Sequence, residues 1–309
     1  MKLPSARPRT GPELSAEAPE NAAPPTRMVS RGREDEVLRF GLDRPWWQDN
    51  YHSALTISWW AFLSIAAGVY VGLNVLFACL YLVQHGSIAN VPDFDFASAF
   101  FFSVQTMATI GYGQLVPQTV YANLLVTTEA LIGMLLIALT TGLMFARFSR
   151  PTARILFSRV AVVSEYNGAA TLFVRTGNER RNQILQADVS MTFLRNELSR
   201  EGTVMRRFYD MKLVRQRTPI FALTFLIMHA VDESSPLHGL SPEAYAAIDG
   251  EIVVTISGLD ETMSQTIHAR TSYTAAEIHW EHRFADIFGY TKDGRRAIDF
   301  DRFHDIVAL

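Results

Sequence analysis

The sequence predicts a membrane α-helical domain, with two transmembrane helices and a re-entrant helix between them, followed by an all-β sandwich domain. Three observations carry this fold class. No Lys or Arg lies between Arg44 and Arg147, two long apolar stretches fall within that gap, and short strand patterns replace them after Phe148. Of the 309 residues 49% are hydrophobic, and the net charge is -3, which suits a membrane segment joined to a soluble domain.

Residues 59–83 and 121–148 are the predicted transmembrane helices. A helix of about 25 residues is roughly 37 Å long, which exceeds the roughly 30 Å of the hydrocarbon core. The first span starts too far along the chain, and lacks the small-residue cleavage site, for a cleaved signal peptide. Arginines precede the first span and follow the second, so we expect a multi-pass protein with both termini in the cytoplasm and the intervening loop outside.

Two segments precede the first span. Residues 1–40 contain six prolines among Ala, Glu and Arg, a composition that predicts a disordered tail. Residues 41–57 are expected to form an interfacial helix, because Trp47, Tyr51 and Leu55 recur at helical spacing with polar residues on the other faces. The alternative is that they are the polar start of the first membrane helix.

Residues 151–309 carry the strand patterns. Strands over 159–166 and 169–175 flank Asn167-Gly168, which is a strong hairpin signal. Further strands are predicted at 188–194 and 251–256, and a short helix at 242–248. Several short strands over this length indicate a β-sandwich. The single cysteine, Cys79, excludes a disulfide within the chain.

The loop between the spans contains the most informative motif. About twelve residues from Phe96 form the expected re-entrant helix, with Asp95 as its N-cap, and Thr109-Ile-Gly-Tyr-Gly113 follows directly. Rings of backbone carbonyls can replace the hydration shell of K⁺, and the two glycines permit the backbone that such rings need. The residues expected to bind K⁺ are Thr109, Ile110, Gly111 and Tyr112, with Gly113 completing the motif.

One chain supplies one carbonyl to each ring, so the motif implies a symmetric tetramer. A glycine turn in a two-span membrane protein is the plain alternative, since Gly-Tyr-Gly by itself is a common tripeptide.

The residues Ser103-Val-Gln-Thr-Met-Ala-Thr-Ile-Gly-Tyr-Gly113 resemble the filter of potassium channels. Downstream, Val174-Arg-Thr-Gly-Asn178, Ser235-Pro-Leu237 and Glu251-Ile-Val-Val254 are similar to the prokaryotic branch of the inward-rectifier family. The resemblance runs from about Arg44 to His304. It implies a homotetramer in the bacterial inner membrane, an immunoglobulin-like cytoplasmic domain that extends the pore, K⁺ ions but no other cofactor, and no nucleic-acid partner.

The resemblance also implies a gate and a hinge. It places the inner gate at Phe145, where four rings could close a pore by dewetting, and the bend of the second helix at Gly133. A lipid-facing aromatic and a close helix contact are the alternatives for these two residues.

Glu129 is an acid inside the second span, and an intramembrane carboxylate is a functional candidate by default. We expect it to hydrogen-bond behind the filter to Thr106 or Gln105; a cavity charge that attracts ions is the alternative. In many relatives a Glu of the pore helix pairs with an Arg after the filter, but Gln105 and Leu115 stand there in this chain.

In animal relatives, acids along the pore hold Mg²⁺ or polyamines and cause strong rectification. The matching residues here carry no negative charge: Ile137, Gln186, Val214, Thr218 and Ser257. A site without charge cannot concentrate a polycation, so little polyamine rectification is expected.

Arginines at the end of the second span suit the anionic inner leaflet. The residues expected to bind anionic lipid, phosphoinositides included, are Arg147, Arg150, Arg154, Trp46 and Trp47. Orientation by the positive-inside rule alone is the alternative. Thr152 and Ala153 replace the lysines of eukaryotic relatives, which leaves the direction of lipid regulation open.

Enzyme functions find little support. His279-Trp-Glu-His282 lacks the spacing of a zinc-protease helix, and neither a Walker loop nor a dinucleotide-binding glycine motif occurs. The competing functions are a membrane-anchored scaffold, in which the segment between the spans is purely structural, and a poorly selective cation channel.

Overall fold

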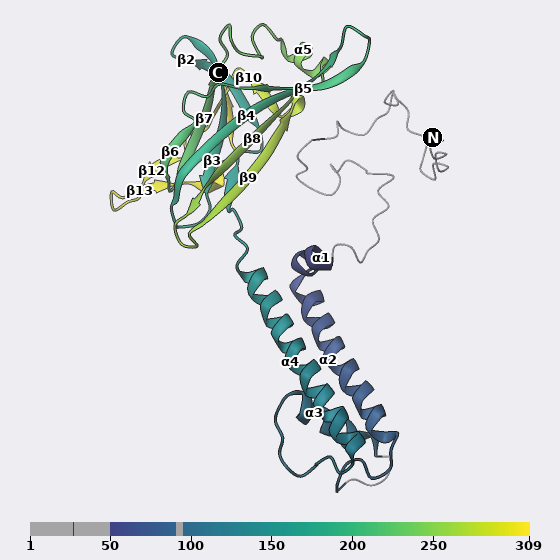
Figure 1. Cartoon of the computed structure of the whole chain (residues 1–309). Helices are drawn as coiled ribbons and strands as arrows, with labels where there is room; N and C mark the ends of the chain where they lie inside the picture. Colours follow the sequence, from purple (N-terminus) through teal and green to yellow (C-terminus); the bar gives the residue numbers. More distant parts are fainter. Residues whose placement is uncertain (1–26, 28–49, 91–94) are drawn as a thin grey trace, which may run out of the picture. The chain divides into compact units, whose positions relative to one another are not determined.

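The computed structural model describes Arg27, residues 50–90 and residues 95–309 (Figure 1). The predicted disordered tail, apart from Arg27, and the first part of the predicted interfacial helix, with Trp46 and Trp47, lie outside the described residues. The chain divides into a helical unit within residues 43–150 and a β unit that contains residues 151–309, and each is described by itself.

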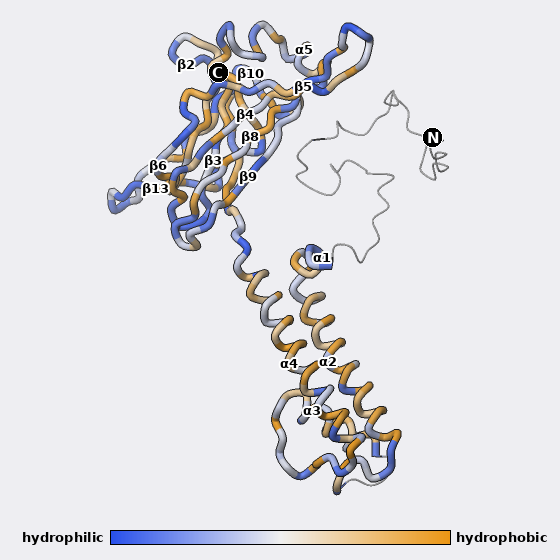
Figure 2. Tube along the Cα trace, in the orientation of Figure 1, coloured by the Kyte–Doolittle hydropathy of each residue, from blue (hydrophilic) through white to orange (hydrophobic). Residues whose placement is uncertain are grey.

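The described residues of the helical unit form four helices, α1 (Asn50–Thr56), α2 (Trp59–Leu82), α3 (Phe96–Met107) and α4 (Val120–Phe148). Helices α2 and α4 are long and apolar enough to cross a membrane and are hydrophobic along most of their length (Figure 2). Both helices have a hydroxyl residue as N-cap. The side chains of Ser58 and Thr119 each accept a hydrogen bond from the backbone N–H three residues later. The predicted arrangement of two spans with a shorter helix between them is therefore confirmed.

The core of the helical unit is small and lies where α2, α3 and α4 meet. Its buried apolar residues include Phe77 and Tyr81 of α2, Phe102 and Met107 of α3, and Ala122 of α4. The rings of Tyr81 and Phe102 meet edge to face with centroids 5.0 Å apart. Most of the apolar surface of the two spans stays exposed in a single chain, so it requires lipid or neighbouring chains to cover it.

The β unit is built from two five-stranded sheets. The strands of the first are β1 (Ile155–Phe157), β2 (Ala161–Tyr166), β3 (Ala169–Asn178), β7 (Thr224–Ala230) and β10 (Ile278–Trp280). Strand β3 pairs antiparallel with β1, β2 and β7, and β10 adds to β2 in parallel.

In the second sheet β4 is central. Its strands are β4 (Ile184–Leu198), β5 (Val204–Asp210), β6 (Arg217–Phe221), β8 (Glu251–Asp260) and β9 (Gln265–Thr274). Strands β5 and β6 pair with successive parts of β4, and β8 lies between β4 and β9. The predicted all-β domain is confirmed.

Smaller elements complete the unit. Two-stranded pairs are β11 (His282–Phe284) with β14 (Ile306–Ala308) and β12 (Phe288–Tyr290) with β13 (Arg296–Ile298). One short helix, α5 (Pro242–Ala247), precedes β8, and 3₁₀ turns occur at Ala275–Glu277 and Phe300–Arg302.

The hairpin predicted at Asn167-Gly168 is present and joins β2 to β3. Asn167 has φ 52° and Gly168 has φ 80°. Positive φ at both central residues defines a type I′ turn, whose twist matches that of the flanking strands, and Asn-Gly is the pair that adopts it at least cost. Local sequence therefore fixes the register of this hairpin.

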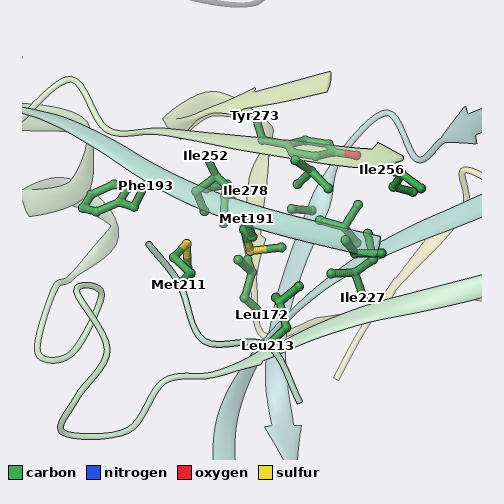
Figure 3. Close-up of a cluster of buried hydrophobic side chains, with 14 of the residues drawn as sticks. Leu172, Met191, Phe193, Met211, Leu213, Ile227, Ile252, Ile256, Tyr273 and Ile278 are labelled. Atoms are coloured by element: carbon green, nitrogen blue, oxygen red, sulfur yellow. The ribbon is translucent and has the colours of Figure 1, made fainter. Parts of the chain in front are cut away.

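Inward-facing side chains of the two sheets form one core (Figure 3). Strand β8 shows the alternation, since Ile252, Val254 and Ile256 are all fully buried while the residues between them are less so. Leu172 and Ile227 from the first sheet pack against these residues from the other side. The apolar residues that predicted a strand at 251–256 are thus the ones that face the core.

Tyr245 of α5 has a buried hydroxyl for which no partner exists among the described residues. Its ring stacks on Phe193 and lies so close to Gly250 that a Cβ there would be 2.7 Å from the ring. A buried hydroxyl without a hydrogen bond costs about 1–3 kcal/mol. We expect Tyr245→Phe to stabilise the protein by about 1 kcal/mol, measured as a higher midpoint of thermal unfolding of the purified chain.

Tyr273 provides the matched control, because it is equally buried in the same core but its hydroxyl donates to the Ser158 carbonyl at 2.8 Å. Tyr273→Phe is expected to lower the unfolding midpoint. If the unfolding midpoint shifted in the same direction in both variants, the missing partner of the Tyr245 hydroxyl would not explain the effect of Tyr245→Phe.

Arg175 of β3 fastens the C-terminal segment to the sandwich. Its guanidinium donates to the carbonyls of Ala285 at 2.6 Å and Phe303 at 3.2 Å and lies 4.6 Å from the ring centroid of Phe284. Burial lowers the pKa of Arg175, and the carboxylates of Asp286 and Asp305 oppose that effect. The group is therefore a desolvated cation held by carbonyls, an aromatic face and nearby acids.

Arg175→Met keeps much of the volume but leaves two buried carbonyls without their donor. We expect it to destabilise the β unit by about 3 kcal/mol, since bonds to a charged group contribute about 1.5–3 kcal/mol each. Limited proteolysis should then cut the segment after Phe284 faster than in the wild type. Arg283→Met, at an exposed residue of β11, is the control, with an expected change below about 0.5 kcal/mol.

Candidate functional site

Helix α3 ends where the Thr109–Gly113 motif begins. It starts at the N-cap Asp95, whose side chain accepts from the backbone N–H groups of Ala97 and Ser98. Its carboxyl end carries the negative end of the helix dipole, about half a charge, which favours a cation nearby.

The motif has an alternating backbone. Thr109 has φ 56°, Gly111 has φ 55° and Gly113 has φ 82°, while Ile110 and Tyr112 have ordinary negative φ. In a plain extended strand successive carbonyls point to opposite sides. Alternating the sign of φ turns successive carbonyls toward the same side, which is the arrangement that a carbonyl filter needs. The sequence indicated this freedom for the two glycines but gave no sign of it for Thr109.

Backbone hydrogen bonds attach the motif to α3. The Ile110 N–H donates to the Gln105 carbonyl at 2.8 Å, and the Thr109 N–H donates to the Thr106 carbonyl at 3.0 Å. Both Gln105 and Thr106 are partly exposed. Just after the motif, the Asn90 side chain donates to the Gln114 carbonyl at 2.9 Å.

Glu129 of α4 is fully buried where α2, α3 and α4 meet. Its carboxyl group contacts the Ser103 hydroxyl and accepts from the Tyr81 hydroxyl at 2.6 Å. Glu129 therefore bonds to Ser103 rather than to the expected Thr106 or Gln105, and Ser103 lies about one turn before Thr106 on α3. That Glu129 supports the filter stays a prediction.

Sequence reasoning missed Asn74, Tyr81 and Ser103. Asn74 is the one asparagine of α2 and is fully buried, with its side-chain oxygen 2.9 Å from the Ser103 hydroxyl. A strongly polar residue in an apolar span was the available signal, because such residues face the protein interior.

Gly133 of α4 packs against the end of α3. A Cβ at this residue would lie 2.8 Å from both Met107 Cγ and the Met107 carbonyl oxygen. Helix α4 runs without interruption from Val120 to Phe148, through the residue expected to be the hinge. The geometry thus favours the close-packing alternative for Gly133.

Phe145 and Ile137 are exposed on α4 in the single chain, by 73% and 53%. Ile137 borders a groove of about 410 Å³ between α2 and α4, together with Leu63 and Tyr70. Both residues are accessible to a neighbouring chain, to lipid or to a pore.

The three arginines differ in their surroundings. Arg147 donates to the carbonyls of Ala54 at 2.5 Å and Ile57 at 2.7 Å, and its guanidinium lies 4.6 Å from the ring centroid of Trp59. Arg150 is exposed and makes one longer bond, 3.3 Å, to the Leu55 carbonyl. Arg154, in the β unit, has a 65% exposed side chain 3.9 Å from Glu179.

Two family models match the chain. One, described as the inward rectifier potassium channel C-terminal domain, matches residues 155–309, and another, described as ion channel, matches residues 55–150. The inward rectifier potassium channel Kirbac3.1 of Paramagnetospirillum magnetotacticum is 45% identical over 281 residues, which cover 91% of this chain and 95% of that protein. The chain belongs to the inward rectifier potassium channel family.

Human relatives are more distant from this inward rectifier. Inward rectifier potassium channel 4 is 34% identical over 68% of the chain, and inward rectifier potassium channel 18 is 29% identical over 83% of it. The matched regions span 49% and 64% of the lengths of those two proteins.

Family membership makes the chain an integral membrane protein of a potassium channel family rather than an enzyme. Potassium ions are therefore its permeating species. Within the described residues no cluster of three or more His, Cys, Asp or Glu side chains could hold a metal ion. His279 and His282 lie with ring centroids 5.4 Å apart, and His282 Nδ1 is 2.6 Å from the Trp280 carbonyl oxygen.

Proposed function

We propose that the chain is one subunit of a homotetrameric channel that conducts K⁺ passively through a filter formed by Thr109 to Gly113. The alternating φ of Thr109, Gly111 and Gly113 carries this proposal, because a backbone of this kind can present successive carbonyls of one chain to one axis. Ile110 and Tyr112 are 47% and 75% exposed in one chain, which leaves room for three further copies around the axis.

Selective flux tests this function. In liposomes that contain the purified protein, Rb⁺ tracer uptake should greatly exceed Na⁺ uptake and should stop when Ba²⁺ is added. Equal uptake of Rb⁺ and Na⁺ would favour the poorly selective cation channel. Absence of flux across several lipid compositions and pH values would favour the membrane-anchored scaffold.

The inner gate is assigned to Phe145. Its side chain is 73% exposed near the end of α4, so four copies could meet at an axis and exclude water. Both termini lie in the cytoplasm in this scheme, and the membrane is the bacterial inner membrane, which agrees with arginines flanking the spans on one side.

Anionic lipids, phosphoinositides included, are the proposed regulators. Arg150 is the best placed cation in the helical unit, since it is exposed and makes only one long hydrogen bond. Arg147 is already bound to two carbonyls, so its contribution to lipid binding is smaller. Arg150→Gln should weaken the response of Rb⁺ uptake to anionic lipid more than Arg154→Gln does.

Little polyamine rectification belongs to the same proposal. Ile137, Gln186, Val214, Thr218 and Ser257 provide no negative charge to hold a polycation. Steep voltage-dependent block by spermine would contradict this part alone.

A further inference from the structure

Four side chains form a hydrogen-bonded chain that joins the three helices α2, α3 and α4. Asn74 Nδ2 is 2.7 Å from the Tyr70 carbonyl oxygen, and Asn74 Oδ1 is 2.9 Å from Ser103 Oγ. Ser103 Oγ also contacts Glu129 Oε1, and Tyr81 Oη is 2.6 Å from Glu129 Oε2. All four side chains are at most 1% exposed, so each polar atom needs a partner within the protein.

The Tyr70 carbonyl fixes the orientation of the Asn74 amide. A carbonyl oxygen only accepts, so the Asn74 atom 2.7 Å away must be the nitrogen. The opposite orientation would bring two acceptors together. Met107 Sδ, a weak acceptor 3.5 Å from Nδ2, agrees with this assignment. Asn74 Oδ1 therefore faces Ser103 and needs a proton from it.

Counting protons then decides the state of Glu129. The Ser103 hydroxyl has one proton, and Asn74 Oδ1 requires it. A second hydrogen bond between Ser103 Oγ and Glu129 Oε1 can form only when the carboxyl group donates. If Glu129 were ionised, the single Ser103 proton could serve only one of its two oxygen neighbours. Ser103 Oγ would then face either Glu129 Oε1 or Asn74 Oδ1 with no proton between them, and the site has no exposed surface where water could compensate.

We infer that Glu129 is a neutral carboxylic acid that donates its proton to Ser103 and so positions the pore helix α3 between α2 and α4. The inference rests on the proposed function, because α3 ends at the filter. Oε2 accepts from Tyr81, and the order of donation runs from Glu129 to Ser103 to Asn74 to the Tyr70 carbonyl. A neutral acid has no charge with which to attract K⁺, so the cavity-charge alternative for Glu129 falls away.

Glutamine is the informative substitution. Its amide nitrogen can donate to Ser103, and its amide oxygen can accept from Tyr81, which reproduces both bonds of a neutral acid. Alanine removes both and leaves the Tyr81 hydroxyl buried without an acceptor. An ionised glutamate, which only accepts, would instead be poorly replaced by glutamine.

Infrared spectroscopy tests the proton directly. The full-length channel in lipid at neutral pH should show the C=O band of a protonated carboxyl group, and Glu129→Gln should lose that band with unchanged carboxylate bands. The inference is overturned if Glu129→Gln instead loses carboxylate intensity and the wild type shows no protonated band.

Flux measurements test the positioning role. Glu129→Gln should keep the wild-type ratio of Rb⁺ to Na⁺ uptake, whereas Glu129→Ala should lower it about tenfold, since a buried donor loses its acceptor. Equal damage in both variants would refute the donor role. If the wild type itself lacks selective uptake, the proposed function fails, and the infrared comparison still decides the protonation of Glu129.

Discussion

Gly111→Ala is expected to abolish selective Rb⁺ uptake. Gly111 has φ 55°, and for any other L-residue the left-handed region costs about 1–2 kcal/mol. Four subunits multiply this to about 4–8 kcal/mol in one filter. Within the single chain no atom lies within 4 Å of a Cβ built at Gly111, so the backbone dihedral is the source of this cost there. The peptide between Ile110 and Ala at position 111 should relax by turning the Ile110 carbonyl away from the axis.

Tracer uptake in liposomes measures this effect as the Ba²⁺-sensitive part of Rb⁺ entry. Gly68→Ala is the matched control, since Gly68 lies within α2 and also has no atom within 4 Å of a built Cβ. Alanine favours a helix interior, so that variant should conduct like the wild type. Retained selectivity in Gly111→Ala would remove the filter from the proposed function.

Gly133→Ala has the second largest expected effect. The new methyl group would lie 2.8 Å from Met107 Cγ and 2.8 Å from the Met107 carbonyl oxygen. The methionine side chain can move aside, but the carbonyl belongs to the end of α3 and cannot move without shifting the filter. Overpacking of this kind costs about 1–3 kcal/mol, so we expect a lower thermal stability together with reduced Rb⁺ selectivity.

Two further variants separate close packing from a hinge at Gly133. Gly142→Ala lies on the same helix with no atom within 4 Å of its built Cβ, and it should leave stability unchanged. Met107→Ala should not rescue Gly133→Ala, because the contact with the backbone oxygen remains. A hinge would give the opposite outcome, in which Gly133→Ala changes gating while the thermal stability and the Rb⁺ selectivity stay intact.

Much of the fold was predictable because it depends on local patterns. Apolar length identifies α2 and α4 without knowledge of their neighbours, and Asn167-Gly168 encodes a turn through the dihedrals that those two residues prefer. The alternation of β8 is similarly local, although its strand extends beyond the predicted residues 251–256 to Asp260.

The partners of Glu129 were not predictable by the same means. Ser103 and Thr106 are three residues apart and differ by only about 60° around α3, so choosing between them requires the exact rotation of this helix about its own axis. Tyr81 lies 48 positions before Glu129 in the chain, so only the packing of α2 against α4 brings them together. The C-terminal attachment by Arg175 has the same origin, since its carbonyl partners follow it by 110 and 128 positions.

Arg147 links the end of α4 to α1. Its guanidinium bridges the carbonyls of Ala54 in α1 and Ile57, just after that helix, and it is rooted in the last turn of α4, two residues after Phe145. A displacement of α1 along its own axis would therefore act on the end of α4 through these two hydrogen bonds of Arg147. Such a displacement of α1 would reach α4, a helix of 29 residues, only two residues after Phe145.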